Sequence, residues 1–215
     1  MQMQFSLPYA MAARLGLALL LGTLAACGTP APRITVYDFG PGATSVPLSN
    51  RMAPLPPVLL AEVEAAPSLD TTAVLYRLAY ADAQQLRPYA QARWSMPPSQ
   101  LLRQRLREIL GQRRSVLAPL DAVAPGTLTL RIELEEFSQL FSTPQNSAAL
   151  VRLRATLGRS GNPAKPLAQT AFVLQIPSGS ADAAGGVRAL AEASDAVVLQ
   201  LGEWMQQAAA AEAAP

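Results

Sequence analysis

The chain has 215 residues, of which 50% are hydrophobic and 15% are charged, a size that suits one domain with a full core and unpacked sequence at its ends. Histidine is absent, which excludes Ser-His-Asp and Cys-His nucleophile systems, the HExxH zinc helix and any histidine proton shuttle. The formal net charge of +2 is too small to indicate a nucleic-acid partner.

Residues 1–26 have the pattern of a lipoprotein signal peptide. Their apolar run, residues 15–24, follows a single arginine and is too short to cross a bilayer, which needs about 20 apolar residues. The run ends in the sequence LAAC, which resembles a bacterial lipobox with Cys27 as its acylated residue. Cys27 is the single cysteine of the chain, so it has no disulfide partner within it. The alternative is an ordinary cleaved signal peptide followed by an incidental cysteine.

Residues 27–33 are expected to form an acylated tether, which spans at most about 20 Å when extended. Several acyl chains on Cys27 would make the attachment to membrane lipid effectively permanent. Gly28, rather than an aspartate, follows the cysteine, and this resembles the sorting pattern of lipoproteins sent to the outer membrane. We therefore expect the protein to be lipid-anchored in the inner leaflet of the outer membrane, facing the periplasm.

The first part of the mature chain predicts strands separated by a long loop. Residues 34–39 alternate and are rich in β-branched and aromatic residues, so they predict a first strand, with further strands at 58–64 and 74–80. Residues 40–57 contain five prolines and predict an extended crossing loop.

Residues 99–110 predict the first helix, because Leu102, Leu106 and Ile109 fall on one stripe. Two prolines precede this segment and suit the first helical turn, where a missing N–H does no harm. Arginines at the other positions form a basic patch, which is either a solvated face or a docking surface for acidic protein or lipid headgroups. The patch consists of Arg103, Arg105, Arg107, Arg113 and Arg114.

Residues 128–176 predict a three-stranded antiparallel meander. Apolar and polar residues alternate in 128–135 and in 151–157, and a hairpin between these strands sets Leu134 opposite Leu153. The same register pairs acids with arginines on the solvent face, Glu133 with Arg154 and Glu135 with Arg152. The acidic cluster at Glu133, Glu135 and Glu136 has the residue types of a carboxylate pair or a metal site, but cross-strand ion pairing is the better account.

The sequence also predicts an irregularity in the first strand of the meander and the position of the second hairpin. Phe137 breaks the alternation, which predicts a bulge or a strand end near Glu136. A second hairpin, centred near Asn162-Pro163, would set Leu153 opposite Phe172.

Residues 183–205 predict a closing helix with Asp182 as its N-cap. The alanine-rich residues 207–215 are expected to form a flexible tail. The complete prediction is one α+β domain over residues 34–206, with a curved, largely antiparallel sheet covered by two main helices.

Aromatic and basic residues concentrate in residues 76–94. Three Tyr, one Trp and three Arg fall within these 19 residues of a chain with 6% aromatic residues, and these residue types anchor protein interfaces. The alternative is that Trp94 and Tyr89 cap the core between helix and sheet. The candidate partner-binding residues are Tyr76, Arg77, Tyr80, Arg87, Tyr89, Arg93 and Trp94.

Four segments carry a resemblance to a known family. They are the lipobox, the first strand with its YDFG sequence (37–40), the block LYRLAYADAQQLRPYAQARWSMPPSQLLRQRLREIL (75–110) and the strand LRIELEEFSQLF (130–141). Together they resemble the ABC-type transport auxiliary lipoproteins, the PqiC-like, paraquat-inducible group. The sequence RWSMPP (93–98) with the helix that follows it is the most specific part of the resemblance, whereas the lipobox alone would indicate only a lipoprotein.

The resemblance implies a non-enzymatic subunit of a lipid transport system. Members of the family work with proteins that carry mammalian-cell-entry (MCE) domains and with ABC transporter subunits, and such systems move lipid between the inner and outer membranes and support outer-membrane integrity. The family has no catalytic residues to transfer, and Cys27 is the position that it implies as a lipidation site. No cofactor or metal is expected. The expected partners are membrane lipid through acylated Cys27 and MCE-domain and ABC transporter subunits, and a homo-oligomer is a further option that the sequence leaves open.

Three other functions remain open from the sequence. A lipid carrier would enclose an apolar pocket between sheet and helices. A periplasmic hydrolase that used carboxylates alone would need two close, buried acids. A purely structural envelope lipoprotein would associate with no transporter.

Overall fold

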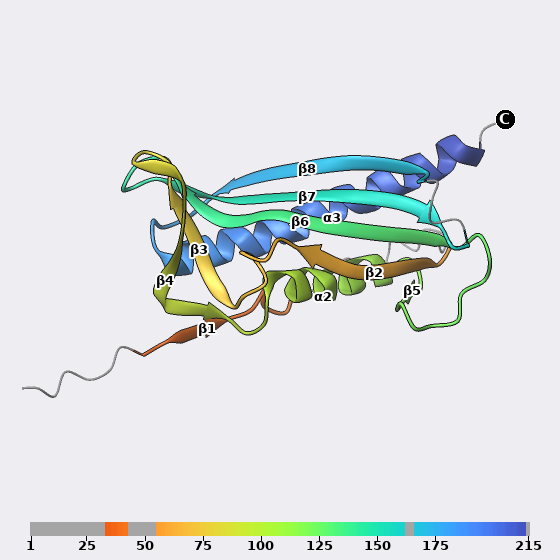
Figure 1. Cartoon of the computed structure of the whole chain (residues 1–215), viewed down its shortest axis with the longest axis horizontal. Helices are drawn as coiled ribbons and strands as arrows, with labels where there is room; N and C mark the ends of the chain where they lie inside the picture. The colour runs from red at the N-terminus through yellow and green to blue at the C-terminus, as the bar shows by residue number, and fades with distance from the viewer. Residues whose placement is uncertain (1–32, 43–54, 162–165, 214–215) are drawn as a thin grey trace, which may run out of the picture. The chain divides into compact units, whose positions relative to one another are not determined.

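The computed structural model describes residues 33–42, 55–161 and 166–213. The predicted signal peptide, Cys27 and nearly all of the tether lie outside these residues, as does most of the crossing loop. The described elements are β1 (Thr35–Tyr37), β2 (Val58–Ala65), β3 (Ala73–Leu78), β4 (Asp82–Trp94), α2 (Pro98–Gly111), β5 (Val116–Leu117), β6 (Leu128–Phe141), β7 (Ser147–Arg159), β8 (Ala168–Pro177) and α3 (Ala183–Ala213) (Figure 1).

Strand β6 organises the eight-stranded sheet. It pairs antiparallel with β7 along one edge, while its other edge is shared by β2 near its start and β3 near its end, both parallel to it. Beyond β3 the sheet continues through β4 to the edge strand β1, and beyond β7 it ends at β8. The two longest ladders, β6–β7 and β7–β8, are antiparallel, and β1, β2 and β3 add parallel pairings, so the sheet is mixed and its α+β class is confirmed.

The meander formed by β6, β7 and β8 has the predicted register. Leu134 pairs with Leu153, which in turn pairs with Phe172, and Glu133 pairs with Arg154. A bulge shifts the ladder after Leu134, so Glu136 rather than Glu135 lies opposite Arg152. The bulge falls beside the position that the broken alternation predicted, and the strand continues past it to Phe141.

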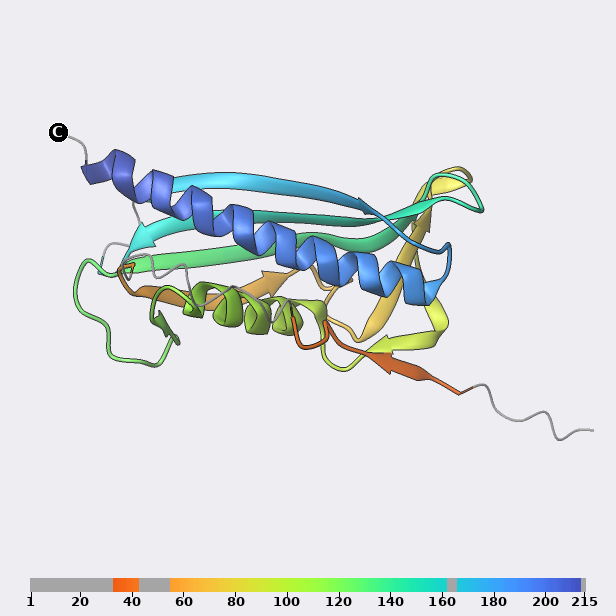
Figure 2. The ribbon, with the colours of Figure 1, turned by 180° about the vertical axis from the view of Figure 1, so that it is seen from behind.

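Both helices cover the same face of the sheet (Figure 2). Helix α2 begins with Pro98 and inserts Leu102 and Leu106, both fully buried, as its apolar stripe predicts. Helix α3 runs diagonally across β6, β7 and β8. Its first turn is capped as predicted, because the Asp182 Oδ1 accepts the Gly185 N–H at 2.7 Å.

Two segments differ from the sequence prediction. Residues 82–94, most of which we interpreted only as a partner-binding segment, form strand β4 and pair with β3 and β1. Helix α3 continues past Met205 to Ala213, into the expected tail. Alanine has the highest helix propensity, and Ala208 and Ala209 pack against the core, so the helix gains both local and tertiary support.

Candidate functional site

The structure divides the seven candidate partner-binding residues by their surroundings. Trp94 is 2% exposed, and its ring lies 5.6 Å from Phe39 and 5.7 Å from Phe137, measured between centroids. A side chain in this position cannot anchor a partner, so the interface role expected for Trp94 is wrong and the core interpretation is correct for this residue. Arg93 donates to the carbonyl oxygens of Tyr89 and Ala92 and so stabilises its own strand.

Tyr76 and Tyr89 form an aromatic pair at the junction of β3, β4 and β6. Their ring centroids are 4.6 Å apart, and Tyr76 also contacts Phe141 edge-on at 6.0 Å. The Tyr89 hydroxyl donates to Gln139 Oε1 at 2.8 Å. Burial, followed by the neighbouring Tyr76 and Asp182, raises the pKa of Tyr89 well above its usual range, so this hydroxyl stays protonated and remains a donor.

Arg77 fastens the β3–β4 hairpin to β6. Its guanidinium forms a two-pronged ion pair with Glu136 at 2.9 and 3.1 Å, and it also donates to the carbonyl oxygens of Ala83 and Gln84. Arg87 donates to Gln85 on its own strand. Tyr80, 48% exposed at the tip of this hairpin, is the most accessible aromatic candidate.

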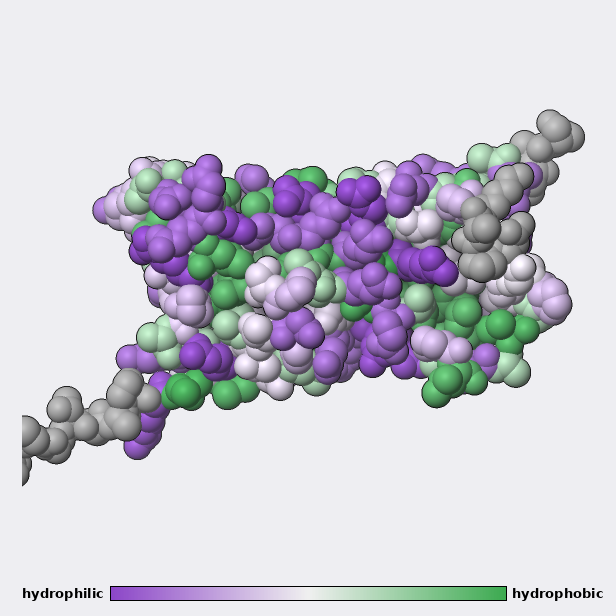
Figure 3. Space-filling model, in the orientation of Figure 1, coloured by the Kyte–Doolittle hydropathy of each residue, from purple (hydrophilic) through white to green (hydrophobic). Residues whose placement is uncertain are grey.

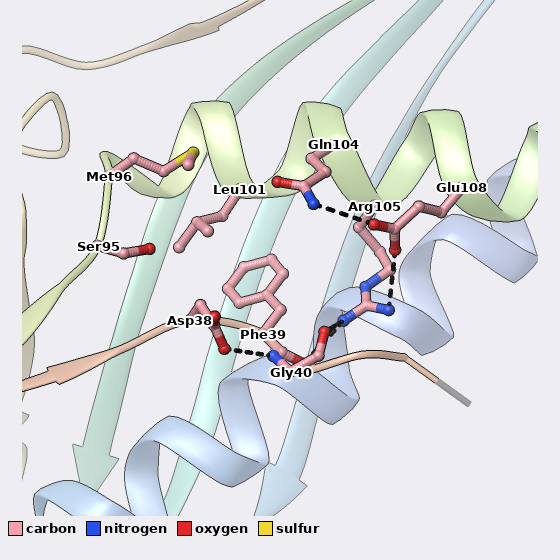
Figure 4. Close-up of a pocket in the computed structure, with 9 residues that line it drawn as sticks. All are labelled: Asp38, Phe39, Gly40, Ser95, Met96, Leu101, Gln104, Arg105 and Glu108. Atoms are coloured by element: carbon pink, nitrogen blue, oxygen red, sulfur yellow. Dashed lines mark hydrogen bonds and ion pairs between the residues drawn. The ribbon is translucent and has the colours of Figure 1, made fainter. Parts of the chain in front are cut away.

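The basic patch predicted around α2 is also divided, because Arg105 is 3% exposed and belongs to the interior. Its guanidinium donates to the carbonyl oxygens of Phe39 at 2.7 Å and Gly40 at 3.0 Å, and it contacts Glu108 at 3.1 Å (Figure 4). It also contacts Asp195 on α3 at 3.0 Å. The contact with Asp195 lies outside hydrogen-bond geometry and is an ion pair. Arg105 thus joins the segment after β1, helix α2 and helix α3.

The backbone around Gly40 is shaped to receive Arg105. Asp38 Oδ1 accepts the Gly40 N–H at 2.8 Å, and Gly40 and Gly42 have φ angles of 68° and 72°. A Cβ atom at Gly42 would lie 1.9 Å from Arg105 Nη1, so a larger residue would displace the guanidinium. The two glycines of the sequence GPG were the available signal for this close approach, which sequence reasoning missed.

Among the acids around Arg105, Asp195 is the one whose pKa is shifted. Burial raises its pKa, as do Glu108 and Glu192, while Arg105 acts in the opposite direction. The side chains of Asp195 and Glu108 are 30% and 44% exposed and both contact Arg105, so this pair is not the buried pair of acids that the hydrolase hypothesis requires. Among the described residues, no group of three or more acids or cysteines is placed to hold a metal ion.

Two hollows border the segment Asp38–Gly40. The smaller has a volume of about 80 Å³ and is bounded by Ser95, Met96 and helix α2, including Arg105 (Figure 4). The larger, about 390 Å³, lies between β1 and the start of α3, where Val187, Arg188 and Ala191 line it. Small-molecule sites typically have volumes of about 300–1,000 Å³, so only the larger hollow has the size of such a site.

The predicted lipidation site, Cys27, lies outside the described residues. No helix in the described part of the chain combines the length and the apolar character that a bilayer span requires.

Comparison with known proteins identifies similar sequences and folds. The family model described as ABC-type transport auxiliary lipoprotein component matches residues 37–202. A crystal structure of a Xanthomonas campestris protein superposes with a TM-score of 0.65 at 21% identity, covering 85% of this chain and 96% of that one. A second, uncharacterized protein gives a TM-score of 0.59 at 14% identity, covering 80% and 99%. At these identities the two structures confirm the fold. No curated protein matched the sequence.

Proposed function

Because the chain belongs to the family of ABC-type transport auxiliary lipoproteins, we propose that it is a membrane-anchored, non-enzymatic subunit of an MCE-type ABC system that moves lipid between the inner and outer membranes. The match over residues 37–202 carries this proposal, since it spans nearly the whole described domain. The membrane in question is the outer one, with the domain facing the periplasm.

The proposed mechanism is an increase in local concentration. Acylation at Cys27, followed by a tether of at most about 20 Å, keeps the domain close to the bilayer. A membrane-bound transporter or its MCE-domain protein then meets the domain at a much higher effective concentration than a diffusing protein would allow. No bond-making step is required of any residue.

Anchoring is tested by replacing Cys27. In cells fed a fatty acid that carries a chemical tag, we expect the wild-type protein to incorporate the tag and the Cys27→Ser variant to incorporate none. The domain of the variant folds as before, because the replaced residue precedes β1. Equal tag incorporation by the two proteins would contradict acylation at Cys27.

The partner is tested by photo-crosslinking in cells from Tyr80, the exposed aromatic candidate on the β3–β4 hairpin. The matched control places the same crosslinker at Val173, which is 60% exposed on β8. We expect an MCE-domain protein or an ABC subunit to be captured from Tyr80 and not from Val173. An anchored Tyr80 variant that captured neither class of protein would contradict the proposed assembly.

The larger hollow favours a second candidate function, that of a lipid carrier. Its wall includes the apolar side chains of Val36, Val187 and Ala191, and Arg188 lies beside them. A carrier should retain phospholipid through purification, so native mass spectrometry of the purified protein distinguishes the two functions. Bound phospholipid beyond the covalent acyl chains would favour the carrier, whereas its absence would favour the anchored subunit.

A further inference from the structure

The connection between β5 and β6 exposes an unusually apolar turn. Residues 118–125 read APLDAVAP and contain one charge, Asp121. The carboxylate of Asp121 accepts the Ala118 N–H at 2.6 Å, and the Ala118 carbonyl accepts the Asp121 N–H at 3.0 Å, which closes a turn around Leu120. Leu120 is 99% exposed, more than any other large hydrophobic residue of the described chain. Hydrophobic side chains gather over this end of the molecule (Figure 3).

Two arginines without acidic partners lie just before this connection. The backbone N–H groups of Arg113 and Arg114 both donate to the Leu110 carbonyl at 3.2 Å, which places them directly after helix α2. Arg114 is 8% exposed, and the Nε of Arg113 is buried without a hydrogen-bond partner. Among the described residues, neither guanidinium has an ion pair with a carboxylate. Residues 43–54, which precede the strand paired with β5, contain no acid either.

The lowered pKa of Arg114 is consistent with the lack of acidic partners. Burial lowers the pKa of its guanidinium, and Arg113 lowers it further. An arginine nevertheless stays protonated in a protein. Two adjacent positive charges at a partly buried position therefore have no carboxylate partner among the described residues, and an anion is the ligand that would pair with them.

The turn and the start of the domain face the same side. Strand β1, which follows the tether, helix α2 and the β5–β6 connection lie along one side of the domain, and β8 lies along the opposite side (Figures 1 and 2). Strand β1 and the β5–β6 connection stand at opposite ends of that side. A short tether before Ile34 would therefore allow this whole side to approach the membrane that holds the anchor.

We propose that this side of the domain lies on the bilayer, with Leu120 inserted at the boundary between headgroups and acyl chains and with the positive charges of Arg113 and Arg114 held close to the lipid phosphates. The proposal rests on the anchoring in the proposed function and adds an orientation to it. Exposed apolar residues beside basic ones match the bilayer interface, where phosphate and hydrocarbon are adjacent.

The test uses the full acylated protein in vesicles of phosphatidylethanolamine and phosphatidylglycerol. Acylation occupies the single native thiol, so Leu120→Cys introduces one free thiol for an environment-sensitive fluorophore. The matched control is Val173→Cys, 60% exposed on β8 at the opposite side of the domain. We expect an aqueous reductant to destroy the label at position 120 about ten-fold more slowly than the label at position 173.

Further variants separate the orientation from the anchoring. Arg113→Gln combined with Arg114→Gln should expose the label at position 120 while the protein still floats with the vesicles. Floating vesicles with equal reaction rates at positions 120 and 173 would overturn the orientation and leave the anchoring intact, whereas loss of flotation by the acylated protein would overturn both. Protection of position 120 that required an added protein partner would overturn the assignment of the surface to lipid.

Discussion

Arginines and acids meet in two very different parts of this domain. On the exposed face of the meander, Arg152 contacts Glu135 at 3.1 Å and Arg154 contacts the same acid at 2.9 Å. Between the helices, Arg105 contacts Glu108 and Asp195 at similar distances. The geometry is alike, but the side chains of Arg152 and Arg154 are 47% exposed and that of Arg105 is 3% exposed.

The difference lies in what happens when one partner is removed. Water replaces a lost partner on the exposed face, so such ion pairs contribute little to stability. The interior offers no such replacement, because the buried carbonyl oxygens that lose a removed arginine keep their desolvation cost and a partly buried acid loses its counter-charge. Exposure, rather than distance, should therefore rank these contacts by their effect on stability.

The largest effect is expected for Arg105→Ala. The substitution leaves Asp195 partly buried without its counter-charge and removes the donors to the carbonyl oxygens of Phe39 and Gly40. We expect a loss of about 3–5 kcal/mol in the free energy of unfolding, measured by urea denaturation. Arg107→Ala, at an exposed position on the same helix, is the control and should change stability by less than about 0.5 kcal/mol. Equal effects of the two substitutions would contradict the ranking.

An intermediate effect is expected for Arg77→Ala. The Arg77 side chain is 20% exposed, while its partner Glu136 is 8% exposed and, among the described residues, would keep the Ser138 hydroxyl, at 2.6 Å, as its one remaining side-chain partner. We expect a loss of about 1.5–3 kcal/mol, with partial recovery in Arg77→Lys, which retains the charge and loses the paired geometry. Arg87→Ala is the matched control on the neighbouring strand, because the hydrogen bonds that Arg87 donates in the described part of the chain stay within β4. Denaturation of the four proteins under one condition decides the order.

The same contrast explains which features the sequence could predict. The meander register follows from local alternation and from charges that face each other across a hairpin, so Leu134, Leu153 and Phe172 were paired correctly. Arg105 lies beside the apolar stripe of α2, and its distant partner Asp195 belongs to α3. Helical periodicity predicts that a charged residue in this position faces solvent. Local sequence patterns cannot predict that Arg105 contacts an acid as distant in the sequence as Asp195.

Strand β4 and its final residue were missed for a related reason. The segment is mostly polar and exposed, so it lacks the alternation that predicts a half-buried strand, although Ala92 and Trp94 at its end are buried. Trp, Arg and Tyr residues occur together both in protein interfaces and at the boundary of a core, so composition does not distinguish the two environments. Only the packing of Phe39 and Phe137 around Trp94 distinguishes the two. Cys27, in contrast, rests on sequence alone, because a lipobox is a linear signal.

The smallest effect is expected for Arg152→Ala on the exposed face of the meander. Glu135 retains Arg154 at 2.9 Å after the substitution, and both side chains remain in contact with water, so we expect a loss of less than about 1 kcal/mol. The salt dependence of the stability loss distinguishes the Arg152 contact from the buried contacts of Arg105. Near 1 M NaCl the screening length falls to about 3 Å, so the difference between wild type and Arg152→Ala should disappear, while that for Arg105→Ala should persist. A salt-insensitive loss in Arg152→Ala as large as that in Arg105→Ala would show that exposure does not rank these ion pairs, because the exposed arginine would then contribute through contacts that water cannot replace.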